Sequence, residues 1–138
     1  MDEVLPVPPK AIGNYATYKK SGNLIFTSGH VPISDNKKYI GKVPNDISID
    51  DAYLAAALCA ELTISTLQAN TDIKKLQPLN VVGFVNADET FEEHAKVLNG
   101  FTDTLTNYFT EKATRSAVGV KSLPLNVCVE VQCIFSYE

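Results

Sequence analysis

Two charged side chains interrupt apolar segments in the last quarter of the 138-residue chain. Arg115 begins a Val-containing stretch, and Glu130 stands within the run 127–137. A guanidinium can bind a carboxylate through two parallel hydrogen bonds, and a carboxylate can take a proton from water. The pair therefore predicts a site that binds a small acid and activates water. The alternatives are an edge arginine paired with a surface carboxylate and a glutamate on the solvated face of a sheet.

The usual signatures of metal, nucleotide and nucleophile chemistry are absent from the sequence. The two histidines, His30 and His94, are far apart, and no Cys/His cluster has metal-ligand spacing. The segment 28–30 is neither a phosphate-binding loop nor a dinucleotide fingerprint, and there is no Ser nucleophile elbow. We therefore expect either a protein that is not an enzyme or chemistry that needs no metal or other cofactor.

Two other residues have both a structural and a functional interpretation. Tyr15 could place its ring in the core or offer its hydroxyl as a donor. His30 follows a predicted strand, where a structural or solvent-exposed role is expected before a catalytic one. Cys128 shares a predicted face with Glu130, but no neighbouring charge would activate its thiol, so it is not predicted to be a nucleophile.

The strands that must position these residues follow from apolar patterning and turn residues. Segments 15–20 and 24–28 predict a hairpin across Ser21-Gly22-Asn23. Segments 79–86, 115–120 and 127–137 predict three more strands. In the last of them the alternating face consists of Val127, Val129, Val131, Cys133 and Phe135. The unpatterned stretch 30–46 predicts a loop, and loops of this length are often functional.

Two helix starts complete the pattern. Ser48 with Asp51 predicts a helix from 49 to about 69, and Thr90 with Glu93 predicts another that ends near Phe109. Gly100 costs the second helix up to ~1 kcal/mol relative to Ala, which indicates close packing there. The order ββαβαββ predicts a single α+β domain over residues 1–138, with both helices on one face of the sheet.

Composition narrows the class of protein. Hydrophobic residues make up 45% and charged residues 20% of the chain, as in globular proteins. The net charge of −4 argues against a nucleic-acid partner. An odd count of three cysteines and the acidic start Met1-Asp2-Glu3 indicate a cytoplasmic protein. No membrane span is expected, because the longest apolar stretch, 54–64, is short and contains Glu61.

Several motifs together resemble the YjgF/RidA family. They are Ile12-Gly13-Asn14-Tyr15, the stretch from Gly22 to Gly29, Arg115-Ser116-Ala117-Val118, Leu123-Pro124 and Val129-Glu130-Val131. Their order and spacing match the family over nearly the whole chain. Two segments are more similar to a side branch of the family, called endoribonuclease L-PSP-like, than to the characterised deaminases. They are the opening Leu-Pro-x-Pro-Pro-Lys and the sequence Arg-Ser-Ala-Val-Gly-Val.

The resemblance implies a chorismate-mutase-like fold that assembles as a homotrimer, with clefts between subunits. It implies that Arg115 binds the carboxylate of a small ligand and that Glu130 acts with a water. It also implies that Tyr15 lines the cleft and that Ser28 and Gly29 supply backbone contacts. Ala117, two residues after the arginine, would contribute its backbone N–H.

The implied activity is hydrolysis of reactive 2-imino or enamino acids to 2-oxo acids and ammonia by a cofactor-free hydrolase. Such enzymes, the 2-iminobutanoate/2-iminopropanoate deaminases, limit metabolite damage. The alternatives are a non-catalytic trimer that binds small carboxylates or acts as a chaperone or regulator, and, ranked last, an endoribonuclease.

This chain departs from the deaminases at three points. Ala117 replaces a Cys or Ser, His30 replaces the usual Gln, and the Asn often found before the second helix has no match near Asp88-Glu89. These departures favour carboxylate binding over deamination by the standard route.

Overall fold

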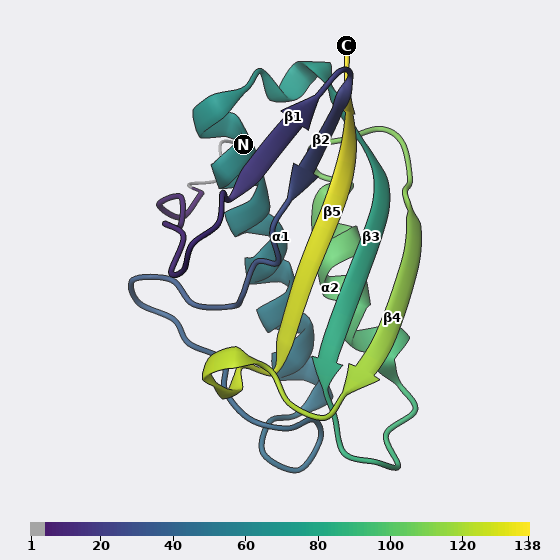
Figure 1. Ribbon diagram of the computed structural model, residues 1–138. Coiled ribbons are helices and arrows are strands. Elements are labelled where there is room, and N and C mark those ends of the chain that lie inside the picture. The colour runs from purple at the N-terminus through teal and green to yellow at the C-terminus, as the bar shows by residue number, and fades with distance from the viewer. Residues whose placement is uncertain (1–4) are drawn as a thin grey trace.

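The computed structural model describes residues 5–138 and confirms the predicted element order. The strands are β1 (Tyr18–Ser21), β2 (Leu24–Thr27), β3 (Leu76–Asn86), β4 (Thr114–Val120) and β5 (Val129–Tyr137). The helices are α1 (Ile49–Asn70) and α2 (His94–Leu105), with 3₁₀ turns at Ile73–Lys75 and Pro124–Asn126. The five strands form one sheet in the order β1-β2-β5-β3-β4 (Figure 1).

This strand order places the two charged residues differently in the sheet. β5 lies between β2 and β3 and is antiparallel to both, so Glu130 is on a central strand, opposite Phe84. β4 pairs only with β3, in parallel, and forms one edge of the sheet. Arg115 therefore lies on an edge strand, paired with Val81.

Both helices pack on the same face of the sheet, as predicted (Figure 1). The strand residues that face them include Gly83, where an added Cβ would overlap Leu98 of α2, and its register partners Val131 and Ala117. Alternation then puts Glu130 on the opposite, open face. That open face also carries Phe26 and Val118, whose side chains are exposed.

The first helix begins where the capping signal predicts. The Ser48 side chain accepts a hydrogen bond from the Asp51 N–H at 3.1 Å. By length and composition α1 could cross a membrane, but 67% of its most apolar stretch is buried inside the domain. Its hydrophobicity is thus that of a core helix.

Gly100 allows the two helices to approach closely, as the sequence indicates. A Cβ at this position would overlap the backbone carbonyl of Tyr53 on α1. Around this contact the core contains Ala56, Ala60 and Phe101, which are all fully buried.

Several predicted boundaries are wrong, and β1 begins at Tyr18 instead of Tyr15. α2 begins at His94, because the Phe91 N–H closes a turn on the Asp88 carbonyl at 3.0 Å. Glu93 is its N-cap and makes no side-chain capping bond, and the helix gives way to turns after Leu105. β3 begins three residues before the predicted position, at Leu76, because a register shift next to Pro78 accommodates the missing N–H.

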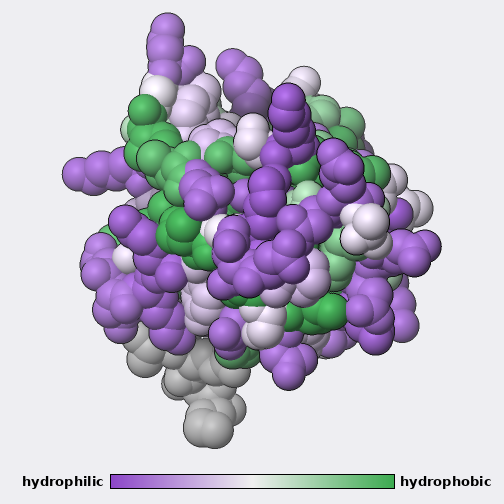
Figure 2. All heavy atoms as spheres, turned by 90° about the horizontal axis from the view of Figure 1, so that it is seen from below, coloured by the Kyte–Doolittle hydropathy of each residue, from purple (hydrophilic) through white to green (hydrophobic). Residues whose placement is uncertain are grey.

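Figure 2 shows the molecule from below, at the lower end of the sheet in Figure 1. This face is mostly hydrophilic and carries a few hydrophobic patches. Segments far apart in the chain meet at this end. They are the loop after β2 and the 3₁₀ turn before β5 (Figure 1). The pocket described next is partly lined by these two segments.

Candidate functional site

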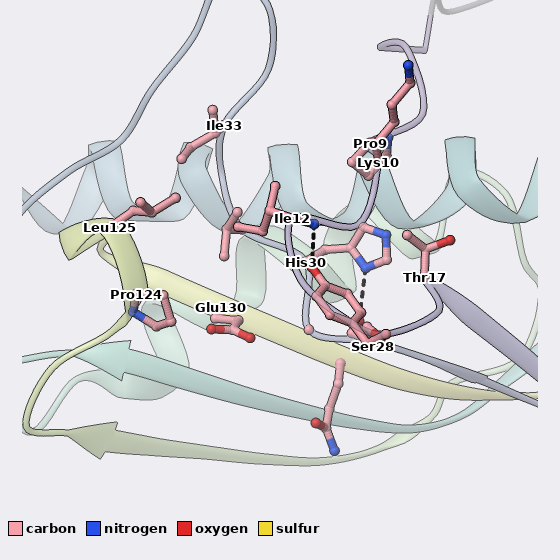
Figure 3. Close-up of a pocket in the computed structure, with 14 residues that line it drawn as sticks. Pro9, Lys10, Ile12, Thr17, Ser28, His30, Ile33, Pro124, Leu125 and Glu130 are labelled. Atoms are coloured by element: carbon pink, nitrogen blue, oxygen red, sulfur yellow. Dashed lines mark hydrogen bonds between the residues drawn. The ribbon is translucent and has the colours of Figure 1, made fainter.

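A pocket of about 800 Å³ lies between the N-terminal arm (residues 5–17), the segment after β2, the turn 124–126 and β5. Its polar lining comes from Lys10, Tyr15, Thr17, Ser28, His30, Glu130 and Gln132. Figure 3 shows Lys10 on the N-terminal arm and Glu130 on β5. Four of the six residues predicted for the site, Tyr15, Ser28, Gly29 and Glu130, therefore line one pocket.

Glu130 supplies the carboxylate of this pocket. Its side chain is half-buried, and burial raises the pKa of its carboxyl group above the usual value. Gly29 lies directly against it, since a Cβ at position 29 would overlap the carboxylate. Only a glycine at this position leaves room for the carboxylate as it stands.

Hydrogen bonds on both sides of Gly29 hold the segment 28–30 in place. The Ser28 N–H donates to the Thr17 carbonyl at 3.0 Å, and the Ser28 hydroxyl donates to the Ala16 carbonyl at 2.5 Å. The His30 N–H donates to the Val131 carbonyl at 2.8 Å, and the Val131 N–H returns a bond to the His30 carbonyl at 3.1 Å. Gly29 is thus fixed between β1 and β5, next to Glu130.

His30 has the structural role that the sequence favours. Its Nδ1 lies 3.0 Å from the Ser28 carbonyl, and its Nε2 lies 3.0 Å from the Thr66 hydroxyl of α1. The side chain is buried, and this desolvation lowers its pKa, although the Ser28 bond opposes the shift. A neutral ring that donates from Nδ1 and accepts at Nε2 satisfies both contacts.

Tyr15 lies at the rim of the pocket, not in the core, with 47% of its surface exposed. Its hydroxyl accepts a hydrogen bond from the Ile12 N–H at 3.4 Å, and its N–H donates to the Gly13 carbonyl at 3.0 Å. These contacts fold residues 12–15 into a compact turn that covers one side of the pocket.

Arg115 is not in this pocket. Its guanidinium donates from one nitrogen to the Asn99 side-chain oxygen at 2.8 Å and to the Thr102 hydroxyl at 3.1 Å, both on α2. It lines a second, smaller pocket of about 280 Å³ with Asp103 and Lys112. Within one chain, Arg115 faces the helices and Glu130 faces the open side of the sheet, so the fold does not bring them together.

Ala117 shares the helix-side face with Arg115, and its side chain packs against the core. Within residues 5–138, no group of three or more His, Cys, Asp or Glu side chains is arranged to hold a metal ion. Cys128 is fully buried, and burial raises its pKa to about 12. It therefore does not supply a thiolate.

The residue that sequence reasoning missed beside Arg115 is Asn99. Asn99 lies within α2, apart from the position near Asp88-Glu89 at which the family resemblance implies an asparagine. The available signal was the spacing of Asn99 and Thr102, two polar residues three positions apart that share a helix face. The residues missed in the larger pocket include Lys10, Ile12, Ile33 and Leu125.

Comparisons with known proteins match this arrangement over most of the chain. The family described as "YjgF/chorismate_mutase-like, putative endoribonuclease" matches residues 3–136. Protein TCP17 of Trypanosoma cruzi is 32% identical over 138 residues, covering 94% of this chain and 85% of that protein.

Solved structures share the fold. Atu1372 from Agrobacterium tumefaciens, described as a protein with unknown function, superposes with a TM-score of 0.86 at 33% identity, covering 91% of this chain and 84% of that one. A Shewanella oneidensis protein described as an endoribonuclease gives a TM-score of 0.90 at 28% identity, covering 98% of this chain and 92% of that one. The chain therefore belongs to the YjgF/chorismate mutase-like family.

Proposed function

We propose that this protein is a cytoplasmic, homotrimeric deaminase that hydrolyses reactive 2-imino and enamino acids to 2-oxo acids and ammonia. The observation that carries the proposal is the Glu130 carboxylate, which is partly desolvated and held against Gly29 at the floor of an 800 Å³ pocket. Family membership adds the expectation of a small carboxylate-bearing ligand. Three buried free thiols suit a reducing compartment.

A complete site requires a second copy of the chain. Lys10 is the cation that lines the pocket with Glu130, whereas Arg115 lies on the other face of the sheet, on an edge strand. We propose that the cleft forms where the pocket of Glu130 meets Arg115 of the partner subunit. The exposed Phe26 and Val118 on the open sheet face are suited to burial between subunits.

In this cleft Arg115 of the partner subunit binds the substrate carboxylate through its planar fork. Asn99 and Thr102 hold the guanidinium in place, because both accept hydrogen bonds from one of its nitrogens. The Gly29 N–H, fixed by the bonds of its two neighbours, lies beside Glu130 and can donate to the reacting centre.

The chemistry is addition of water to the C=N bond. Glu130 takes a proton from water as the oxygen attacks the imine carbon, and it returns this proton to the nitrogen, which takes up the C=N electrons. Glu130 then moves the hydroxyl proton of the adduct to the amine nitrogen in the same way, which makes ammonia the leaving group. Collapse of the resulting carbinolamine breaks the C–N bond and releases ammonia and the 2-oxo acid. A carboxyl group whose pKa is raised towards neutrality is suited to such transfers.

The test is ammonia release from imines that an amino-acid oxidase generates in the assay. The protein should accelerate the formation of ammonia and 2-oxo acid over the spontaneous rate, and the Glu130→Gln protein should not. Equal rates with and without the protein, over imines of several side chains, would remove the deaminase proposal.

A non-catalytic carboxylate-binding trimer is the second candidate. Ala117 favours it, because this side chain packs against the core and offers no polar group. Ligand binding that depends on Arg115, without turnover of any imine, would identify this function.

The endoribonuclease activity named in the family description ranks last. A net charge of −4 opposes RNA binding.

A further inference from the structure

The side of the pocket opposite the polar groups is made of apolar side chains from three separate segments. Ile12 comes from the N-terminal arm, Ile33 from the loop after β2, and Leu125 from the turn before β5. Figure 3 shows the three side chains above Glu130, with Pro124 below Leu125. Ile12 and Leu125 are 72% and 60% exposed, so the domain itself does not bury either side chain.

Leu125 is held in an unfavourable backbone conformation. Its φ of 59° lies in the left-handed region, and Asn126 follows with a φ of 56°. A bulky residue in this region is a genuine outlier, and outliers of this kind concentrate at ligand sites. Asn or Gly would relieve the strain, so the fold alone does not favour leucine here. The leucine side chain itself therefore has a role.

The arm that carries Ile12 is fixed to the domain. The Ser65 hydroxyl of α1 donates to the Pro6 carbonyl at 2.5 Å. The Ile12 N–H donates to the Tyr15 hydroxyl, which closes the turn at the pocket rim. Ile12 is thus presented beside the pocket by a tethered segment, although most of its surface meets solvent.

We propose that Ile12, Ile33 and Leu125 form a subsite for the substrate side chain, and that the preferred substrates are 2-imino acids with branched or extended apolar side chains. This inference rests on the proposed function for the reacting group. The carboxylate and imine lie at the Glu130 and Gly29 end, and the side chain extends towards the three apolar residues.

The pocket's size and apolar lining favour this class of substrate. Its volume of about 800 Å³ is in the range of sites for sizeable ligands and far exceeds what an alanine-derived imine fills. An acidic side chain is disfavoured against Ile12, Ile33 and Leu125, because these apolar side chains would desolvate its charge without donating a hydrogen bond.

The experiment compares binding of stable 2-oxo acid products by isothermal titration calorimetry. The 2-oxo acid of leucine should bind at least about tenfold more tightly than pyruvate, because each buried methylene is worth about fourfold in affinity. The 2-oxo acid of glutamate, a chain of similar length with a carboxylate, should bind more weakly than that of leucine.

Leu125→Asn separates side-chain recognition from folding. Asn tolerates the left-handed conformation, so this variant should unfold at an equal or higher temperature than the wild type. Its preference for the leucine-derived acid over pyruvate should fall by at least about threefold. Ile12→Asn should lower the same preference. Its matched control is Val7→Asn, because Val7 is 70% exposed on the same arm and does not line the pocket.

Equal affinity for the leucine-derived acid and pyruvate, or no binding of the leucine-derived acid at millimolar concentration, would overturn the subsite. The subsite would also be overturned if Leu125→Asn and Ile12→Asn changed the oligomeric state but kept the wild-type preference for the leucine-derived acid over pyruvate. These two residues would then contact another subunit instead of the substrate. Size-dependent binding with no ammonia release would instead keep the subsite and remove the deaminase proposal.

Discussion

The backbone of Gly29 lies so close to the Glu130 carboxylate that any side chain at position 29 would displace it. The two residues come from segments about a hundred positions apart in the chain. They are brought together because His30 pairs with Val131 across the gap between the segment after β2 and the strand β5. The position of the proposed base thus depends on a glycine and on one backbone bridge.

Gly29→Ala should therefore impair catalysis much more than folding. The methyl group would push the Glu130 carboxylate out of its position, and a misplaced general base loses most of its contribution of ~10²–10⁴-fold. We expect a large fall in kcat with a small change in thermal unfolding temperature. Wild-type kcat in this variant would show that the close contact has no catalytic role.

Glu130→Gln should abolish turnover and alter the dependence of stability on pH. Burial raises the pKa of the Glu130 carboxyl, so wild-type activity should rise with pH through a value above 4.5 as the base form appears. In the same range the folded protein binds more protons than the unfolded one, so this carboxyl lowers stability as the pH rises.

Urea unfolding at several pH values would measure this effect. The stability of Glu130→Gln relative to the wild type should increase between pH 4.5 and pH 7. A constant difference across that range would argue against a buried, ionising Glu130.

His30→Gln should reduce the loss of stability in mild acid. Burial lowers the pKa of His30 below 6.5, so the unfolded chain takes up the proton first as the pH falls. Stability from this residue is present above pH 6.5 and declines below it. Gln can keep contacts to the Ser28 carbonyl and the Thr66 hydroxyl without titrating, so unfolding curves from pH 7 to pH 5 should be flatter for the variant.

Thr66→Val gives a second measure of the same contact. It removes the only side-chain partner that the structure shows for His30 Nε2 within residues 5–138. A buried nitrogen left unpaired costs about 1–3 kcal/mol, which chemical denaturation would detect. No loss of stability would mean that the His30 ring is satisfied in another way.

Gly100→Ala should destabilise the domain even though Ala is the better helix former. The added methyl would overlap the Tyr53 carbonyl and force α1 and α2 apart. Overpacking of this kind costs about 1–3 kcal/mol, more than the ~1 kcal/mol that Ala gains in helix propensity. Urea denaturation should show a net loss, and a net gain would contradict the close contact between the helices.

The sequence predicts the fold well because its signals are local. The Ser48 cap, the alternation in β5 and the turn at Gly22 each determine an element without reference to distant residues. Thr90 misled the prediction for α2, since the turn closed by Phe91 on Asp88 competes with the capping box. Such competition depends on tertiary packing and cannot be read from spacing alone.

The site was predictable only in part, because tertiary packing also decides which face of the sheet each site residue occupies. Alternation along β5 indicates that Glu130 leaves the core face, but the face that Arg115 occupies depends on the parallel register of β4 with β3. Leu125 carried no signal at all, because its left-handed backbone is visible only in three dimensions.

Glu130 of one subunit is proposed to act with Arg115 of the partner subunit. Trimers that mix two variant chains test this pairing most directly. Arg115→Gln and Glu130→Gln chains, each inactive alone, would be co-expressed with different tags and purified as mixed assemblies. In a mixed trimer of either composition one cleft of the three has both native residues, so the purified mixed assemblies should show about a third of wild-type activity. Mixed trimers as inactive as either parent would contradict the claim, because both residues would then have to come from the same chain.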